Sequence, residues 1–328
     1  MILEQKQTRK WRYGKNRWFV LLVLILGVIG ARAFAPVQPH IQLPAESLSK
    51  QPLFTSKLFG EFYFTNTMTA LLIVMAVLIF MALFVRNSVN KSLRNGDYVP
   101  KGVAGVLEAL LEYLYNLTEA TAGKKWTKTI FPWFATITLM VLLANWMELI
   151  PGVDSIGLLE PSAHGHAIQQ VLPGVDTIIK QEAQDGEGYT LIPFVRTLST
   201  DLNFTIALAL IAVSMVQVVG VKAQGMKYFT KFWNTKNLFS KPFFGAIDWV
   251  VGLLEIISEI SKILSFGFRL FGNIFAGSVM LFVIGSLIPV FAQSIFVGLE
   301  LFVGAIQALV FGMLTMVFMS MATKGHGE

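Results

Sequence analysis

The sequence contains no cysteine, so disulfide bonds, thiolate nucleophiles and cysteine-ligated zinc or iron–sulfur sites are excluded. Charge is also scarce: 14% of the 328 residues are Asp, Glu, Lys or Arg, whereas 54% are hydrophobic. The mean hydropathy of +0.62 is higher than a water-soluble domain tolerates. A glycine-rich phosphate-binding loop with its Lys and Ser or Thr is also lacking. These absences favour an integral membrane protein over a redox or nucleotide-hydrolysing enzyme.

Long apolar stretches predict about five membrane-spanning helices. A helix needs about 20 mostly apolar residues to cross a bilayer. The fourth stretch is too long for an upright crossing, because a helix of its length extends about twice the hydrocarbon thickness, so it must tilt, bend or split. We expect an all-α integral membrane protein whose last two helices are long and steeply tilted. The predicted spans lie near residues 66–85, 129–150, 202–221, 243–288 and 294–322.

Two segments between the spans have a different character. Residues 103–121 carry apolar side chains at helical spacing, with Glu108, Glu112 and Glu119 off that stripe, which predicts an amphipathic helix on the cytoplasmic surface. Residues 152–196 are rich in Gly, Pro and acids, which indicates a loop with some local helix. That loop contains His164 and His166, and the absence of further ligands favours an exposed pair over a metal site. Residues 36–328 thus form one polytopic membrane domain.

The net charge of +6 is better explained by membrane topology than by binding to nucleic acid. Basic residues gather after the first span, before the second and after the third, whereas the 152–196 loop is mainly acidic. The basic connections therefore lie in the cytoplasm, and the C-terminus ends there too. The basic residues concerned are Arg86, Lys91, Arg94, Lys101, Lys124, Lys125, Lys128, Lys222, Lys227, Lys231, Lys236 and Lys241.

In the N-terminal residues 1–35, six basic side chains precede a short apolar run from Trp18 to Ala31, and an Ala-Arg-Ala-Phe-Ala segment ends it. Two interpretations fit this pattern: a cleaved secretory signal and a retained signal-anchor. Both place residues 36–51 outside.

Polar and ionisable groups within the last two spans are the strongest functional signal. Each ionisable group there costs about 2.5–3.5 kcal/mol on insertion scales, so chains that retain them usually use them. Helical spacing places the polar residues of each span on one face, and we expect the two faces to meet. Small residues beside them allow another backbone to approach closely, an outside partner included. The polar residues are Glu255, Glu259, Lys262, Ser265, Arg269 and Asn273, then Glu300 and Gln307; the small ones are Gly267, Gly272, Ala276, Gly277 and Gly304.

Structural interpretations of these residues remain open. Arg269 and Glu300 could form a buried salt bridge that only joins two helices. The cluster of Glu255, Glu259 and Lys262 could be solvated at the cytoplasmic boundary. Glu148, Asp201 and Asn203 lie near the outer ends of their spans, where they could be caps or vestibule residues.

The segment Arg269-Leu270-Phe271-Gly272-Asn273-Ile274-Phe275-Ala276-Gly277 resembles the R-L-F-G-N-x-x-A-G signature of subunit a of F-type ATP synthases. Other similar pieces follow the family's order, and the resemblance covers roughly residues 60–150 and 197–323. They are Thr65-Asn66-Thr67, residues 145–151, residues 201–205, Gln307-Ala308 and Ser320-Met321-Ala322.

The resemblance implies a non-catalytic stator with two offset half-channels, in the cell's inner (plasma) membrane. Arg269 matches the family's essential arginine, which faces a rotor ring and separates the half-channels. Asn273, Gln307 and Glu255 match polar channel positions, and Ser265 matches a small polar position near the inner path. The implied partners are the ring of subunit c with its ion-binding carboxylates, peripheral stalk subunit b, the soluble ATPase head and lipid; no cofactor, metal or nucleic acid is implied.

The chain departs from the family pattern at a few positions. Ser278 and Glu300 stand where some members have a carboxylate and a histidine, and Ile263 where proline is frequent. The acidic function is thus relocated between helices. Glu300, with Ser278 and Gln307, becomes the candidate relay from the outer vestibule, whereas Glu255, Glu259 and Ser265 line the inner exit.

Two other functional classes compete with this interpretation. A secondary ion-coupled transporter or stand-alone channel predicts a central cavity and often an internal repeat, which the sequence does not show. A purely structural scaffold leaves the intramembrane polar groups unexplained. The choice between proton and sodium stays open, because it depends mainly on the ring.

Overall fold

The computed structural model describes most of the chain. Residues 1–16, most of the signal-like segment and the positions of Lys101, His164, Lys236 and Lys241 lie outside the described residues. Two compact units are distinguished: one comprises Met1–His40, Leu159–Leu191 and Val279–Leu299, and the other comprises the remainder. The described residues are 45–57, 60–94, 102–150, 152–162, 165–182, 188–232, 242–287 and 291–324, with scattered positions from 17 to 29.

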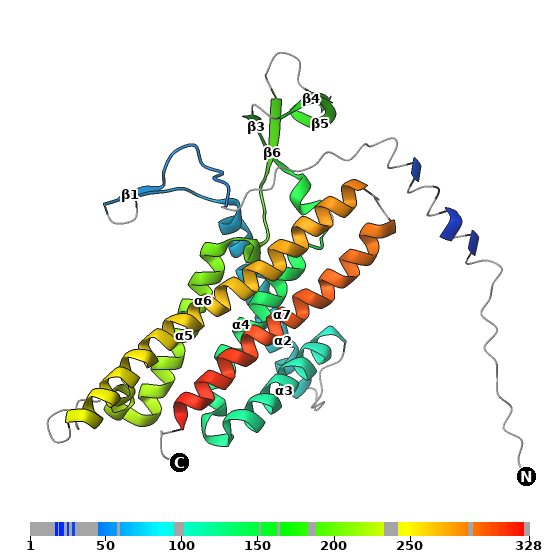
Figure 1. Cartoon of the computed structure of the whole chain (residues 1–328). Helices are drawn as coiled ribbons and strands as arrows, with labels where there is room; N and C mark the ends of the chain where they lie inside the picture. Colours follow the sequence, from blue (N-terminus) through cyan, green and yellow to red (C-terminus); the bar gives the residue numbers. More distant parts are fainter. Residues whose placement is uncertain are drawn as a thin grey trace, which may run out of the picture. The chain divides into compact units, whose positions relative to one another are not determined.

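All five predicted spans are helices (Figure 1). Within the described residues, five helices are long and apolar enough to cross a membrane, so the chain is a multi-pass, mainly α-helical membrane protein. The fourth span is a single helix of 46 residues, which is not split. The helices are α2 (Asn66–Arg94), α4 (Lys124–Met147), α5 (Leu202–Gln224), α6 (Pro242–Leu287) and α7 (Phe291–Thr323).

The predicted amphipathic segment is helix α3 (Val103–Ala122). Leu114 on this helix is buried in a cluster with Ile130 and Phe134 of α4, whereas Val103 and Val106 at its start are exposed. Gly123 separates α3 from α4 with φ +75°, a value that L side chains rarely adopt. The chain can therefore turn directly from the surface helix into the second span.

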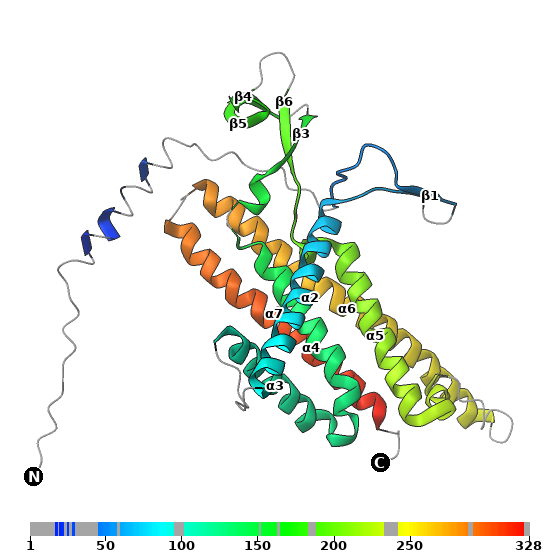
Figure 2. The same ribbon diagram turned by 180° about the vertical axis from the view of Figure 1, so that it is seen from behind.

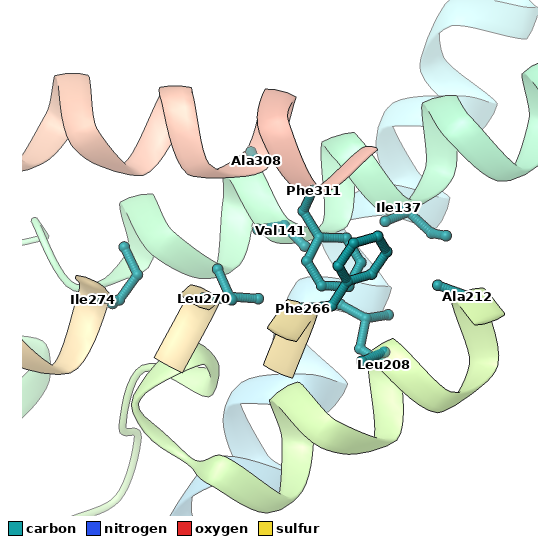
Figure 3. Close-up of a cluster of buried hydrophobic side chains, with 10 residues drawn as sticks. Ile137, Val141, Leu208, Ala212, Phe266, Leu270, Ile274, Ala308 and Phe311 are labelled. Carbon is teal, nitrogen blue, oxygen red and sulfur yellow. The ribbon is translucent and has the colours of Figure 1, made fainter. Parts of the chain in front are cut away.

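A buried apolar cluster joins four of the spans (Figure 3). Phe266, Leu270 and Ile274 of α6 contribute one face to it, and the rings of Phe266 and Phe311 are 5.3 Å apart. Lipid is as apolar as these side chains, so close packing and not water exclusion holds such helices together. This cluster decides which face of α6 points inward. The other members are Ile137 and Val141 of α4, Leu208, Ala209 and Ala212 of α5, and Ala308 and Phe311 of α7.

The prediction of an irregular loop at 152–196 was wrong. The segment forms four strands in the order β3-β6-β4-β5, preceded by a 3-10 turn, η1 (Val153–Ser155). The β4–β5 hairpin turns at Pro173-Gly174, and Val, Ile and Thr side chains, which suit a pleated surface, recur along its strands. The acidic and glycine content hid this pattern. The strands are β3 (Gly157–Ser162), β4 (His166–Leu172), β5 (Val175–Glu182) and β6 (Gly188–Pro193).

Shorter elements flank the spans. A hairpin of β1 (Phe54–Ser56) and β2 (Gly60–Phe62), which the sequence did not predict, precedes α2. The 3-10 helix η3 (Leu198–Thr200) precedes α5, and η4 (Gly225–Lys231) follows it. Asp201 caps α5 by accepting a hydrogen bond from the Asn203 amide, 2.9 Å, and it also accepts one from the Thr67 hydroxyl, 3.0 Å. The cap interpretation of Asp201 therefore holds, and it ties α2 to α5.

Candidate functional site

One face of α6 is left open by the buried cluster. Its buried residues Phe266, Leu270 and Ile274 are interleaved with exposed positions that recur at intervals of one, three or four. This pattern is a continuous helical stripe that no described part of the chain covers. We call these positions the open face: Ser265, Phe268, Arg269, Gly272, Asn273 and Ala276.

Arg269 lies on this open face and is exposed. Among the described residues no carboxylate forms an ion pair with it, since the ion pairs found there all join Lys to Glu. The hypothesis of an Arg269–Glu300 salt bridge is therefore not what the structure shows. A guanidinium stays charged under all conditions, so within the described residues Arg269 places an unneutralised positive charge on an otherwise apolar stretch of helix.

Glu300 occupies a different environment on α7. It is only 3% exposed, and its carboxylate lies so close to Gly277 of α6 that a Cβ there would collide with it. Within the described chain no hydrogen-bond donor reaches Glu300 Oε1. Gly277 and Gly267 therefore serve packing within the chain, against Glu300 and Ile206 respectively, while Gly272 lies on the open face.

Glu148, which the sequence left as either a cap or a vestibule residue, lies near Ser278 of α6. The Ser278 hydroxyl donates to the Ile274 carbonyl, 3.0 Å, and also lies within hydrogen-bonding reach of Glu148, the residue that follows α4. Glu148 in turn interacts electrostatically with Glu300, Asp154 and Arg196. Its Oε2 is reached by no donor of the described residues. Glu148 thus lies within electrostatic range of the buried Glu300 and of charged groups beyond the end of α4.

Polar contacts join the end of α4 to α7 near these carboxylates. Asn145 Nδ2 donates to the Gly304 carbonyl, 3.0 Å, and Asn145 Oδ1 accepts from the Ser199 hydroxyl, 2.5 Å. Trp146 Nε1 donates to the Leu301 carbonyl, 3.0 Å. Gly304 therefore faces α4, not α6 as its spacing with Glu300 suggested. Gln307 is half-buried on α7.

The inner polar residues of α6 form an ion-paired cluster. Glu259, 8% exposed, accepts from both Lys231 and Lys262 at 3.0 Å, and Lys231 lies 3.6 Å from Glu255. Lys231 also lies over the ring of Tyr228, 4.3 Å from its centroid. For Glu259 the hypothesis of a solvated boundary cluster was therefore wrong, because η4 covers it. The sequence had assigned Lys231 only to a basic connection.

Comparison with known proteins decides the family. The family model described as ATP synthase A chain matches residues 68–320. The chain belongs to this family. ATP synthase subunit a of Buchnera aphidicola is 28% identical over 293 residues, 88% of this chain and 93% of the relative. Subunit a of Pseudoalteromonas atlantica is 31% identical over 236 residues, which are 69% of this chain and 78% of the relative. Subunit a of Mycobacterium leprae is 26% identical over 274 residues, which are 82% of this chain and 91% of the relative.

Membership in the ATP synthase A chain family confirms the resemblance drawn from residues 269–277. The chain is accordingly a non-catalytic membrane subunit that works within the ATP synthase complex. The matched region runs from α2 to α7 and contains both the open face and the buried carboxylates.

Burial raises the pKa of Asp154 to about 6, from an ordinary value of 3.8, against the opposing effect of Arg196. The folded chain thus prefers the neutral acid, and this stabilisation is complete below about pH 4 and lost as the pH rises through 6. Asp154→Asn stays neutral at every pH. We expect its melting temperature in detergent to exceed that of the wild type by about 2–4 °C near pH 8 but not near pH 4. The melting temperatures are measured by tryptophan fluorescence. An equal difference in melting temperature between the variant and the wild type at both pH values would contradict the raised pKa of Asp154.

Gly277→Ala tests the contact with Glu300. The new methyl group must displace the Glu300 carboxylate, so we expect ATP-driven proton pumping in membrane vesicles to fall several-fold, by about 1 kcal/mol or more in barrier. Gly298→Ala on α7 is the matched control, because a Cβ there meets nothing within 4 Å in the described chain. Equal pumping by the two variants would show that the position of Glu300 does not matter.

Proposed function

We propose that the chain is the ion-translocating stator of a rotary F-type ATP synthase, with two half-channels separated by Arg269, and that it couples proton flow to ATP synthesis. The observation that supports this most is an exposed arginine on the open face of α6 without a carboxylate partner in the described chain. Membership in the ATP synthase A chain family also supports the proposal, because another subunit of the complex can supply the carboxylate partner of Arg269.

The arginine acts on the carboxylates of a passing rotor ring. A carboxylic acid that faces lipid keeps its proton, because a low dielectric penalises the charged form. A guanidinium within a few ångströms favours ionisation, so the ring acid releases its proton as it arrives beside Arg269. Because the guanidinium never loses its own charge, it also prevents protons from passing directly between the half-channels.

The outer half-channel runs past the half-buried Glu148 to the buried Glu300. Protons enter past Asp154 and Arg196, reach Glu148 and pass by way of Ser278 to Glu300. The Ser278 hydroxyl, which donates to the Ile274 carbonyl, lies within hydrogen-bonding reach of Glu148 and adds a polar group to this path. This path explains how Ser278 on α6 and Glu300 on α7 can stand where some members of the family have a carboxylate and a histidine, respectively. Gln307 and Asn273 are further polar positions of the channel.

The inner half-channel opens along the cytoplasmic half of α6. Ser265 is exposed on the open face, and Glu255 is half-buried lower on the same helix. Lys231 and Lys262 neutralise the negative charge of Glu259, so the exit is polar at this point without being negatively charged. Each charge that crosses contributes about 2.3 kcal/mol per 100 mV of membrane potential.

The proposal includes the surroundings of the chain. Its partners are the ring of subunit c, peripheral stalk subunit b, the soluble ATPase head and membrane lipid, in the cell's inner membrane, with the C-terminus in the cytoplasm. Purification of the tagged chain in mild detergent is expected to co-isolate a proteolipid ring and an ATPase head. A homogeneous oligomer that transports ions without them would favour the secondary transporter instead.

A further inference from the structure

The β1–β2 hairpin is a ribbon with two unlike faces. Phe54 and Phe62 are cross-strand partners on one face, and their rings stack with centroids 4.8 Å apart. Thr55 pairs with Glu61 on the other face, where Glu61 accepts a hydrogen bond from Tyr63, 2.6 Å. The hairpin therefore has one aromatic and one polar face.

The aromatic face is uncovered by the described chain. Phe54 is 55% exposed and Phe62 40%. A two-stranded hairpin is at best marginally stable alone in water, so such a ribbon gains from any apolar surface that covers its aromatic face. The stacked pair is therefore an exposed apolar patch, and such patches mark interaction surfaces.

The hairpin is held at the entrance of a membrane span. Phe62 precedes the first residue of α2 by only four positions, which allows about 13 Å of extended chain. Backbone hydrogen bonds from Leu48 to Phe64 and from Asn66 to Glu46, 2.7 and 3.1 Å, tie the base of the hairpin to the start of the helix. Figures 1 and 2 show the hairpin projecting sideways from the end of α2 and not continuing along its axis.

We propose that the aromatic face of the β1–β2 hairpin docks on the lipid headgroup region of the bilayer and anchors the outer end of α2. Aromatic side chains concentrate at this level of membrane proteins, where an apolar ring can sit beside polar headgroups. The exposed Lys50 and Lys57 flank the pair and suit anionic headgroups. Two rings bury about 150–250 Å² each, far less than the roughly 800 Å² that a stable protein interface needs from each partner.

The absence of cysteine makes the test direct. Phe54→Cys and Thr55→Cys each place one thiol in this chain, on the aromatic and the polar face respectively, for an environment-sensitive fluorophore. The labelled complex, its other thiols removed, is reconstituted in phosphatidylcholine–phosphatidylglycerol vesicles, and intact ATP-driven pumping verifies assembly. A shallow nitroxide lipid is expected to quench the label at 54 about threefold more than that at 55, with the opposite order for aqueous iodide.

Three other outcomes overturn the proposal. Equal access of iodide to both labels shows that the face stays in water. Equal quenching of both by the nitroxide lipid excludes one-sided docking. Shielding of position 54 from lipid and iodide alike shows that a protein partner covers it. Phe62→Cys repeats the measurement on the second strand, so a local disturbance at 54 cannot decide the result.

Discussion

Arg269→Ala is expected to abolish ATP-driven proton pumping while ATP hydrolysis by the soluble head continues uncoupled. A cation a few ångströms from a carboxylic acid changes its proton affinity by about 10- to 1,000-fold, and no other basic residue lies on the open face to replace it. Inverted membrane vesicles with a pH-sensitive dye measure pumping directly. The loss should match that factor or exceed it, because the barrier that we propose between the half-channels would disappear with the charge.

Ser261→Ala is a suitable control for the arginine variant. Ser261 is exposed on the same helix two turns before Arg269, and its hydroxyl donates to the Ile257 carbonyl of its own helix, 2.8 Å. We expect pumping to be retained in this variant. If the alanine variant of Arg269 coupled as well as the wild type, the arginine would have no place in the mechanism.

Glu300→Gln is expected to slow both passive and ATP-driven proton flux by about tenfold or more, since a positioned acid–base group contributes that much and usually more. Glutamine has nearly the same size, so the packing against Gly277 should persist while the ionisable group is lost. Passive flux is measured in vesicles stripped of the soluble head, which separates conduction from ATP chemistry.

Glu160→Gln provides the comparison for this second variant. Glu160 is an exposed carboxylate on β3, and its loss should leave both fluxes unchanged. A slowed Glu160 variant would point to a general effect of removing an acid. Flux through Glu300→Gln equal to that of the wild type would reduce Glu300 to a packing residue.

The spans and the arginine could be predicted because each depends on local chemistry. Apolar length alone determines that α2, α4, α5, α6 and α7 form, since backbone groups in lipid must be satisfied within a helix. Arg269 stands out because it is the only charged residue in the sequence between Leu264 and Phe291. A charge within a membrane span is costly, so its retention indicates a function. These inferences needed no knowledge of which helix contacts which.

What the sequence missed depended on neighbours in space. Helical spacing put Glu259 and Arg269 on one face, yet η4 buries the first and leaves the second open. Gly277 and Gly272 look alike in sequence, although only Gly277 lies under the Glu300 carboxylate. Glu148 lies near Ser278 of α6, 130 positions away in the chain, and no periodicity within α4 indicates that proximity.

Imaging of the intact complex by electron cryo-microscopy tests the central claim most directly. The open face of α6 should lie against the rotor ring, with the Arg269 guanidinium directed at a ring carboxylate near the middle of the membrane. An Arg269 side chain turned toward lipid or toward this chain's own helices, with no ring against that face, would contradict the proposed mechanism.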